Sequence, residues 1–217
     1  MPRTADASAS PDQTSIDRLL GTTPPPVRAA IDGRALCTEL FRWEGYRREM
    51  FVDWRGQVRT GIGLVLPDAR AALALPWRHK ATGFPATAAE VRAAFAQVRA
   101  QSAGHAAPAH QRASNLVLPA GYAAVLVMRR LERELLPALR RLFVRFDHYP
   151  LPARRALVEM AYNLGVAGLR GFSNLIAACN RADFAAAADQ CHRRTIGVAR
   201  NAATRALFRK AAGLSIT

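Results

Sequence analysis

Residues 43–66 of the chain, WEGYRREMFVDWRGQVRTGIGLVL, decide its fold. Strand-forming residues are concentrated here and are punctuated by glycines, a pattern typical of a small β-hairpin or β-sheet. A proline at position 67 closes the segment. The strand formers are Phe51, Val52, Val58, Ile62, Val65 and Leu66, and the glycines stand at 56, 61 and 63.

On both sides of this segment, apolar residues recur at helical spacing. Thr87 and Glu90 form a capping box at the start of one helix. Pro119 suits the first turn of another helix, which Pro137 is expected to kink or divide. Helices are predicted at about 27–43, 87–100, 119–146, 152–164, 173–180, 183–193 and 200–212. The expected fold class is therefore α+β and mostly α-helical.

Length and composition favour one folded domain with a tail. The chain has 217 residues, of which 50% are hydrophobic, and this is enough for a core. Residues 1–26 end in three prolines and are rich in Ser, Thr and Asp, so they are predicted to be a flexible tail or linker. The folded domain is placed at residues 27–217.

The formal net charge of +15 favours a polyanionic partner. The alternatives are nucleic acid, anionic lipid and anionic cell wall, or a basic surface that only keeps the protein solvated. Nucleic acid is not expected, because no helix-turn-helix or RRM-type signature appears and the basic residues are spread along the chain.

No cofactor and no metal site are expected. Cys37, Cys179 and Cys191 form no CxxC pair, and the five histidines show no ligand spacing such as HExxH. No run of about 18 apolar residues appears, so no membrane span is predicted. The N-terminus lacks the apolar stretch of a signal peptide, so we expect synthesis in the cytoplasm without the general secretory route.

Two carboxylates, Glu44 and Asp53, lie nine residues apart across the start of the β segment. Glycosidases commonly need one neutral carboxyl group, which protonates the leaving oxygen, and one ionised carboxylate, which acts on a water molecule or on the sugar cation. Trp43 supplies an apolar neighbour for Glu44. Two acids nine residues apart are also common as plain surface charges.

The longer pattern around these acids resembles the phage-type lysozymes, glycoside hydrolase family 24. The first match is Glu44-Gly45-x6-Phe51-x-Asp53-x2-Gly56 followed by Gly61-x-Gly63-x-x-Leu66. The second is ALVEMAYNLG at 156–165, followed by Gly168 and by GFSNL at 171–175. A third and weaker match is DFAAA at 183–187 with Arg200-Asn201 and RALF at 205–208. Together they span roughly residues 35–212.

The resemblance implies a lysozyme-like fold, in which a small β-hairpin or β-sheet subdomain faces a helical subdomain across a cleft. It implies a muramidase that hydrolyses the β-1,4 bond between N-acetylmuramic acid and N-acetylglucosamine in peptidoglycan. The general acid of the family carries over to Glu44 and its second catalytic carboxylate to Asp53. Tyr162 and Asn163 match positions that bind the saccharide, and Trp54 beside Asp53 is a candidate for stacking on a sugar ring.

The chain departs from the family at the catalytic threonine. The glycine register puts Arg59 in that position and Thr60 one place late. Because strand side chains alternate, either a β-bulge brings Thr60 to the site or Arg59 occupies it and contacts substrate. An arginine beside Glu44 would favour the ionised form of that acid. The alternative function is therefore a catalytically weakened module that binds peptidoglycan.

Two routes to the cell wall remain open. A phage endolysin reaches it through a holin pore, whereas an antibacterial effector is injected by a secretion system. The effector route adds a secretion-system carrier and an immunity protein as expected partners, and the proline-rich tail slightly favours it. In both cases the expected form is a monomer that acts in the periplasm or on the wall.

Overall fold

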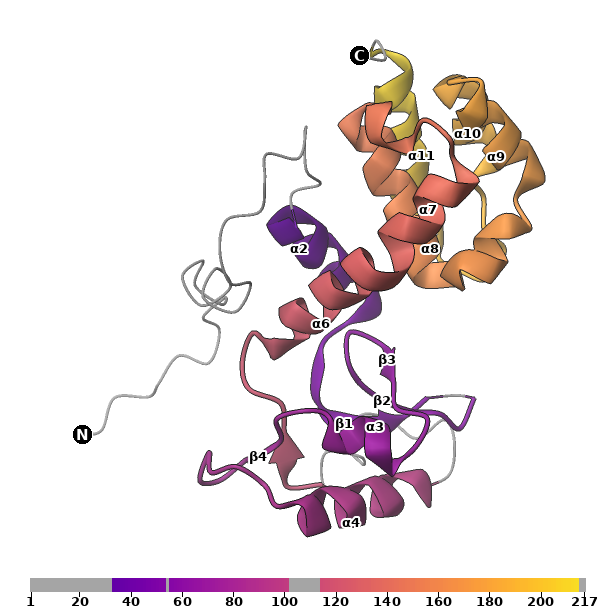
Figure 1. The fold of residues 1–217 in the computed structure, drawn as a ribbon. Coiled ribbons are helices and arrows are strands. Elements are labelled where there is room, and N and C mark those ends of the chain that lie inside the picture. Colours follow the sequence, from indigo (N-terminus) through magenta and orange to yellow (C-terminus); the bar gives the residue numbers. More distant parts are fainter. Residues whose placement is uncertain (1–32, 54, 102–113, 215–217) are drawn as a thin grey trace. The chain divides into compact units, whose positions relative to one another are not determined.

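The computed structural model describes residues 33–53, 55–101 and 114–214. The fold is α+β, about 60% helical with a small antiparallel sheet, which confirms the predicted fold class. The described residues form two compact units (Figure 1). Unit 1 comprises residues 44–127, and unit 2 comprises residues 33–43 and 128–214. The predicted tail, residues 1–26, lies outside the described residues.

The sheet of unit 1 has three antiparallel strands in the order β1-β2-β3. These are β1 (Arg47–Val52), β2 (Val58–Gly61) and β3 (Leu64–Val65), and they confirm the predicted hairpin segment. Phe51 pairs with Arg59, and Thr60 pairs with Leu64. Gly63 has a φ of 69°, a left-handed conformation that suits the tight turn between β2 and β3.

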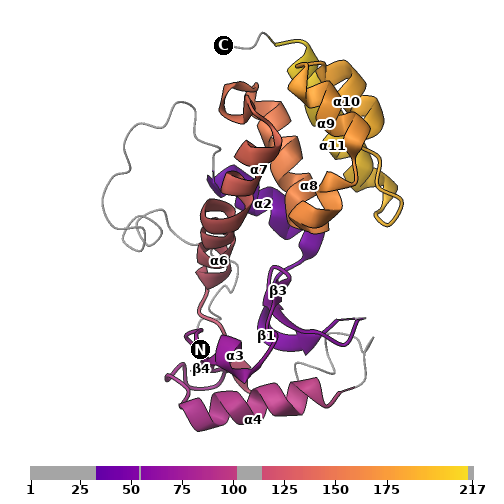
Figure 2. The ribbon, with the colours of Figure 1, turned by 45° about the vertical axis from the view of Figure 1, so that its right-hand side comes forward.

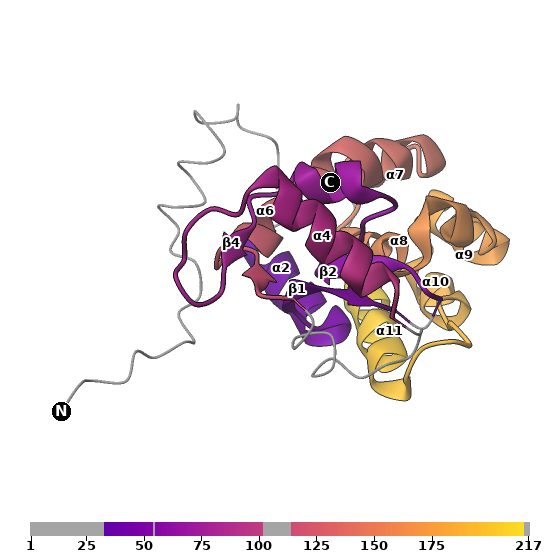
Figure 3. The same ribbon diagram turned by 90° about the horizontal axis from the view of Figure 1, so that it is seen from below.

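Helices and a second strand pair complete unit 1. They are α3 (Ala69–Leu73), β4 (Arg78–His79), α4 (Ala88–Arg99) and β5 (Leu116–Val117), with β4 and β5 antiparallel. The predicted capping box of Thr87 and Glu90 is present at the start of α4. Viewed from below, α4 crosses β1 and β2, which it contacts (Figure 3). The core between these elements includes Met50, Val52, Leu66, Trp77, Phe95 and Val98.

Unit 2 is helical (Figure 2). Helix α2 (Gly33–Glu44) leads out of it and α6 (Tyr122–Arg130) leads back into it. Then follow a π-helix (Leu131–Leu135), α7 (Leu136–Leu142), a 3₁₀ turn (Phe146–His148), α8 (Leu151–Arg170), α9 (Ser173–Asn180), α10 (Phe184–Gln190) and α11 (Val198–Ala212). Helix α11 packs against α8 and α10.

Two interruptions divide the longer helical segments. Pro137 lies in the first turn of α7, directly after the π-helix, so the helix predicted for 119–146 is divided there. In α8, Gly165 has φ 70° and ψ 163°, values outside the helical region, so the first part of α8 ends where the sequence predicts. Among the described residues, no helix has the length and apolar character needed to cross a bilayer.

Candidate functional site

Asp53 is held by its own hairpin. Its Oδ1 atom accepts hydrogen bonds from the backbone N–H groups of Arg55 (2.8 Å) and Gln57 (2.9 Å). The backbone closes the same loop, because the N–H of Gly56 donates to the Asp53 carbonyl oxygen at 3.0 Å. The carboxylate therefore caps the β1–β2 connection, and its orientation is fixed by the fold of unit 1.

Arg59 binds the other oxygen of this carboxylate. Its Nε atom lies 2.6 Å from Oδ2 of Asp53, and the Asp53 side chain is only 9% exposed. The guanidinium also donates to the carbonyl oxygen of Gly63 at 3.3 Å and to Oε1 of Gln57 at 3.2 Å. Three contacts from one planar group fix the position of Arg59 along the hairpin.

Glu44 and this guanidinium both lie close to Gly63. It is the last residue of α2, it is half-buried, and Gly45 follows it with a φ of 70°. A Cβ atom placed on Gly63 would lie 3.5 Å from Nη1 of Arg59 and 3.9 Å from Oε2 of Glu44. Arg59 therefore pairs with Asp53, and its Nη1 atom and the Glu44 carboxylate both lie near one point beside Gly63.

Thr60 occupies a different environment from Arg59. It is fully buried, and its hydroxyl has no hydrogen-bond partner among the described residues. Val58 and Thr60 are buried whereas Arg59 between them is half-buried, which is the alternation expected along a strand. Arg59 is thus the residue beside Asp53, and which of the two takes the threonine role stays a prediction. Trp54 lies outside the described residues.

The predicted saccharide-binding residues of unit 2 are neighbours on α8. Tyr162 is 7% exposed, and the guanidinium of Arg130 lies 4.5 Å above its ring. Asn163 is half-buried and accepts a hydrogen bond from Nη1 of Arg193 at 3.2 Å. Both residues precede the helix break at Gly165 by one turn or less.

Unit 2 also contains a buried charged cluster that sequence reasoning missed. Glu159 on α8 is 1% exposed and binds two arginines, Arg193 and Arg200. Thr204 donates to Oε2 of Glu159 at 2.9 Å. Every residue from 156 to 162 is buried, so an acidic residue within this apolar run was the signal that a buried partner exists.

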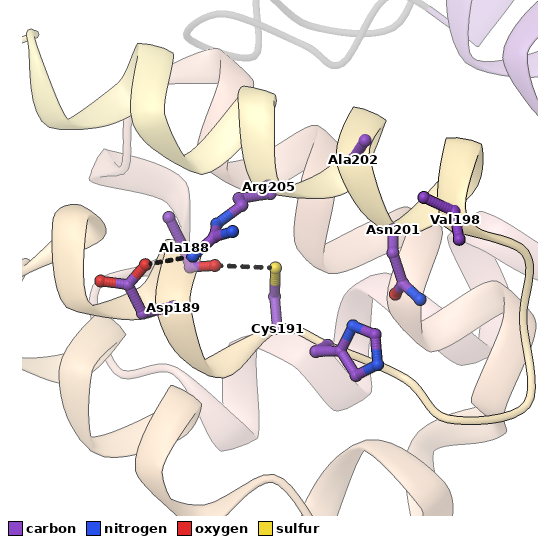
Figure 4. Close-up of a pocket in the computed structure, with 8 residues that line it drawn as sticks. Ala188, Asp189, Cys191, Val198, Asn201, Ala202 and Arg205 are labelled. Atoms are coloured by element: carbon purple, nitrogen blue, oxygen red, sulfur yellow. Dashed lines mark hydrogen bonds and ion pairs between the residues drawn. The ribbon is translucent and has the colours of Figure 1, made fainter.

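Neither of two cavities contains a predicted site residue. One, of about 340 Å³, lies in unit 2 against α10 and α11 and is drawn in Figure 4. Asp189 and Arg205 form an ion pair there at 2.7 Å, and the thiol of Cys191 donates to the Ala188 carbonyl oxygen. Burial raises the pKa of Cys191, which lowers the fraction of reactive thiolate. The other, of about 260 Å³, is lined in part by Val65, Phe95 and Arg99 of unit 1.

The described part of the chain contains no cluster of three His, Cys, Asp or Glu side chains that could hold a metal ion. No family model matches the chain, and no curated protein matches it either.

Proposed function

We propose that the chain is a peptidoglycan hydrolase that cleaves the β-1,4 bond between N-acetylmuramic acid and N-acetylglucosamine. The observation that carries the proposal is the arrangement of Glu44 and Asp53 around Arg59 within unit 1. The sequence places these two acids in the order and spacing of the phage-type lysozymes. The contacts of Arg59 support the proposal, because its Nε pairs with Asp53 and its Nη1 lies with the Glu44 carboxylate beside Gly63.

Asp53 is the residue assigned to the second catalytic carboxylate, and the hairpin fixes its orientation. Its Oδ1 atom accepts two backbone N–H bonds, and its Oδ2 atom lies beside the guanidinium of Arg59. In the proposed reaction Glu44 donates its proton to the glycosidic oxygen as the C1–O bond breaks. The Asp53 carboxylate stabilises the cationic sugar or removes a proton from the attacking water.

The net charge of +15 has a role in this proposal. Cell walls carry peptide-stem carboxylates and anionic polymers, and a basic protein is attracted to them over roughly a Debye length, about 8 Å at physiological salt. The enzyme would act on the wall after delivery through a holin pore or by a secretion system. An immunity protein belongs to the second route.

The proposal is tested with purified peptidoglycan and mass spectrometry of the soluble products. New reducing muropeptide ends are expected from the wild type and not from Glu44→Gln, with circular dichroism showing that the fold is kept. Glu132→Gln, which removes an exposed acid of unit 2, serves as the matched control and should digest like the wild type. Digestion at the wild-type rate by Glu44→Gln would remove Glu44 from the mechanism.

A second candidate function is a module that binds peptidoglycan without cutting it. The ion pair between Asp53 and Arg59 favours it. The contacts described for the Asp53 carboxylate, to Arg59 and to two backbone N–H groups, all hold the hairpin together. Such a module would sediment with insoluble peptidoglycan and release no reducing ends. Sedimentation together with product analysis therefore separates the two candidates in one experiment.

A further inference from the structure

The feature of unit 2 that the proposed function leaves unexplained is the set of polar contacts made by the two terminal nitrogens of Arg193. Nη1 donates to Oε1 of Glu159 and to Oδ1 of Asn163, each at 3.2 Å. Nη2 lies 2.7 Å from Oε2 of Glu159 and donates to Oγ1 of Thr204 at 2.6 Å. The two terminal nitrogens therefore make four polar contacts within 3.2 Å, and rotation of the group would break them. Nε of Arg193 has no hydrogen-bond partner among the described residues.

The main chain of Arg193 is fixed as well. Its N–H donates to Oδ1 of Asn201 at 3.0 Å, and its carbonyl oxygen accepts from Nδ2 of Asn201 at 2.9 Å. Arg193 is 2% exposed, and no solvent competes for these bonds. A side chain held at both ends in this way can impose an orientation on the one member of the cluster that is half-buried, Asn163.

The orientation of the Asn163 amide follows from the chemistry of arginine. A guanidinium has donors only, so the amide atom that faces Nη1 of Arg193 must be the oxygen. The Nδ2 group is then the amide atom that does not face Nη1 of Arg193. Arg193 thus takes one lone pair of the Asn163 oxygen and leaves the two N–H donors of the amide for a ligand.

We propose that Arg193, held by Glu159, is a positioning residue that leaves the N–H donors of Asn163 for an acceptor oxygen of an N-acetylated sugar, such as its acetamido carbonyl. This inference rests on the proposed function, because that function supplies the saccharide. Two arginines against one glutamate also leave the cluster with an excess positive charge. That charge favours a neutral or anionic group at Asn163 over a cationic one.

The test uses Asn163→Asp, which has nearly the same shape and still accepts a hydrogen bond from Arg193 but has no N–H to offer. The thermal midpoint should stay the same or rise, because a carboxylate gains an arginine partner. The affinity for the N-acetylglucosamine trimer should fall about tenfold, since a donor is replaced by an acceptor. Peptidoglycan digestion should show a raised KM with kcat little changed.

Arg205→Ala is the matched control, because it removes a positive charge of unit 2 that contacts Asp189 and not Asn163. It should leave trimer binding unchanged. Arg193→Lys keeps the charge but loses the planar fork of donors. It should weaken trimer binding when position 163 is Asn, and it should have no further effect when position 163 is Asp. If that variant fails to fold, the Asn163→Asp comparison decides the matter alone.

A ligand-free measurement tests the orientation by itself. The side-chain NH₂ signals of Asn163 in a ¹⁵N–¹H spectrum should broaden when a soluble gadolinium chelate is added, and protected signals would overturn the proposal. Equal trimer affinity for wild type and Asn163→Asp would also overturn it. If reducing ends still appeared in that case, the muramidase proposal would stand without this inference, whereas a wild type that releases none refutes the muramidase proposal itself.

Discussion

Arg59 and Asp53 form an ion pair across the first hairpin, with Nε and Oδ2 at 2.6 Å. The pair joins the strand β2 to the loop that precedes it, and it occupies one of the two carboxylates on which the proposed chemistry depends. Its effect on activity therefore discriminates between a hydrolase and a binding module.

Arg59→Gln is expected to lower product release about tenfold. Asp53 keeps its two backbone donors but loses the group that orients Oδ2. The free energy of unfolding should fall by only about 1 kcal/mol, because the Arg59 side chain is 26% exposed. Arg92→Gln, an exposed change in α4, controls for loss of charge. Faster digestion would instead show that Arg59 holds Asp53 back from the reaction.

Glu159→Gln should destabilise unit 2 by about 3–5 kcal/mol, because it leaves two buried arginines without their counter-charge. Asp189→Asn provides a matched comparison. Asp189 also binds two arginines, Arg205 and Arg209, but all three side chains are exposed, so little change is expected. Urea unfolding followed by circular dichroism measures the free energy of unfolding of both variants. An equal loss in the two would contradict the claim that burial makes the Glu159 ion pairs important.

The start of α4 should lose stability in acid. Hydrogen bonds from the backbone N–H and the hydroxyl of Thr87 lower the pKa of Glu90 below its ordinary value of 4.5, and His79 adds a smaller effect. A lowered folded-state pKa means that the stabilisation is present above 4.5 and is lost as the pH falls through the folded value.

Thermal melts of the wild type and of Glu90→Gln test this between about pH 6 and about pH 3. The wild type should be the more stable at the upper end, and the difference should shrink toward the lower end. A difference that grew on acidification would show that the carboxylate is not stabilised by the cap.

The three thiols should resist alkylation in the native protein. Cys37, Cys179 and Cys191 are all buried, and none of them forms a disulfide. Burial, with a smaller effect of Cys191, raises the pKa of Cys179 to about 12. At pH 8 the thiolate fraction of such a group is on the order of 10⁻⁴. Mass spectrometry after iodoacetamide treatment should show no label on Cys179 without denaturant and full labelling with it.

Local signals in the sequence predicted much of the fold. The capping box at Thr87, the glycines of the hairpin, the stop at Gly165 and the division near Pro137 each act within a few residues, so sequence alone identifies them. The pairing of β4 with β5 was not predicted, because Arg78 and Val117 are 39 positions apart and each strand has two residues.

The candidate site was predictable in part for the same reason. Glu44, Asp53 and Arg59 lie within one hairpin-sized segment, so their spacing fixes their proximity. Arg193 lies in the connection between α10 and α11, with no periodic pattern around it. Its partner Glu159 comes from α8 and its partner Thr204 from α11. No local rule connects residues that meet only after unit 2 has folded.

The division of the chain has a consequence for its synthesis. Among the described residues, unit 1 comes from the single stretch 44–127, whereas unit 2 needs residues 33–43 together with residues after 127. The ion pair of Glu39 with Arg155 at 2.7 Å joins residues 116 positions apart across that interval. Contacts of such long sequence separation form late. On the ribosome, unit 1 can therefore complete its core before α2 packs into unit 2. A nascent chain that stopped before Arg155 would leave Glu39 of α2 without this ion pair.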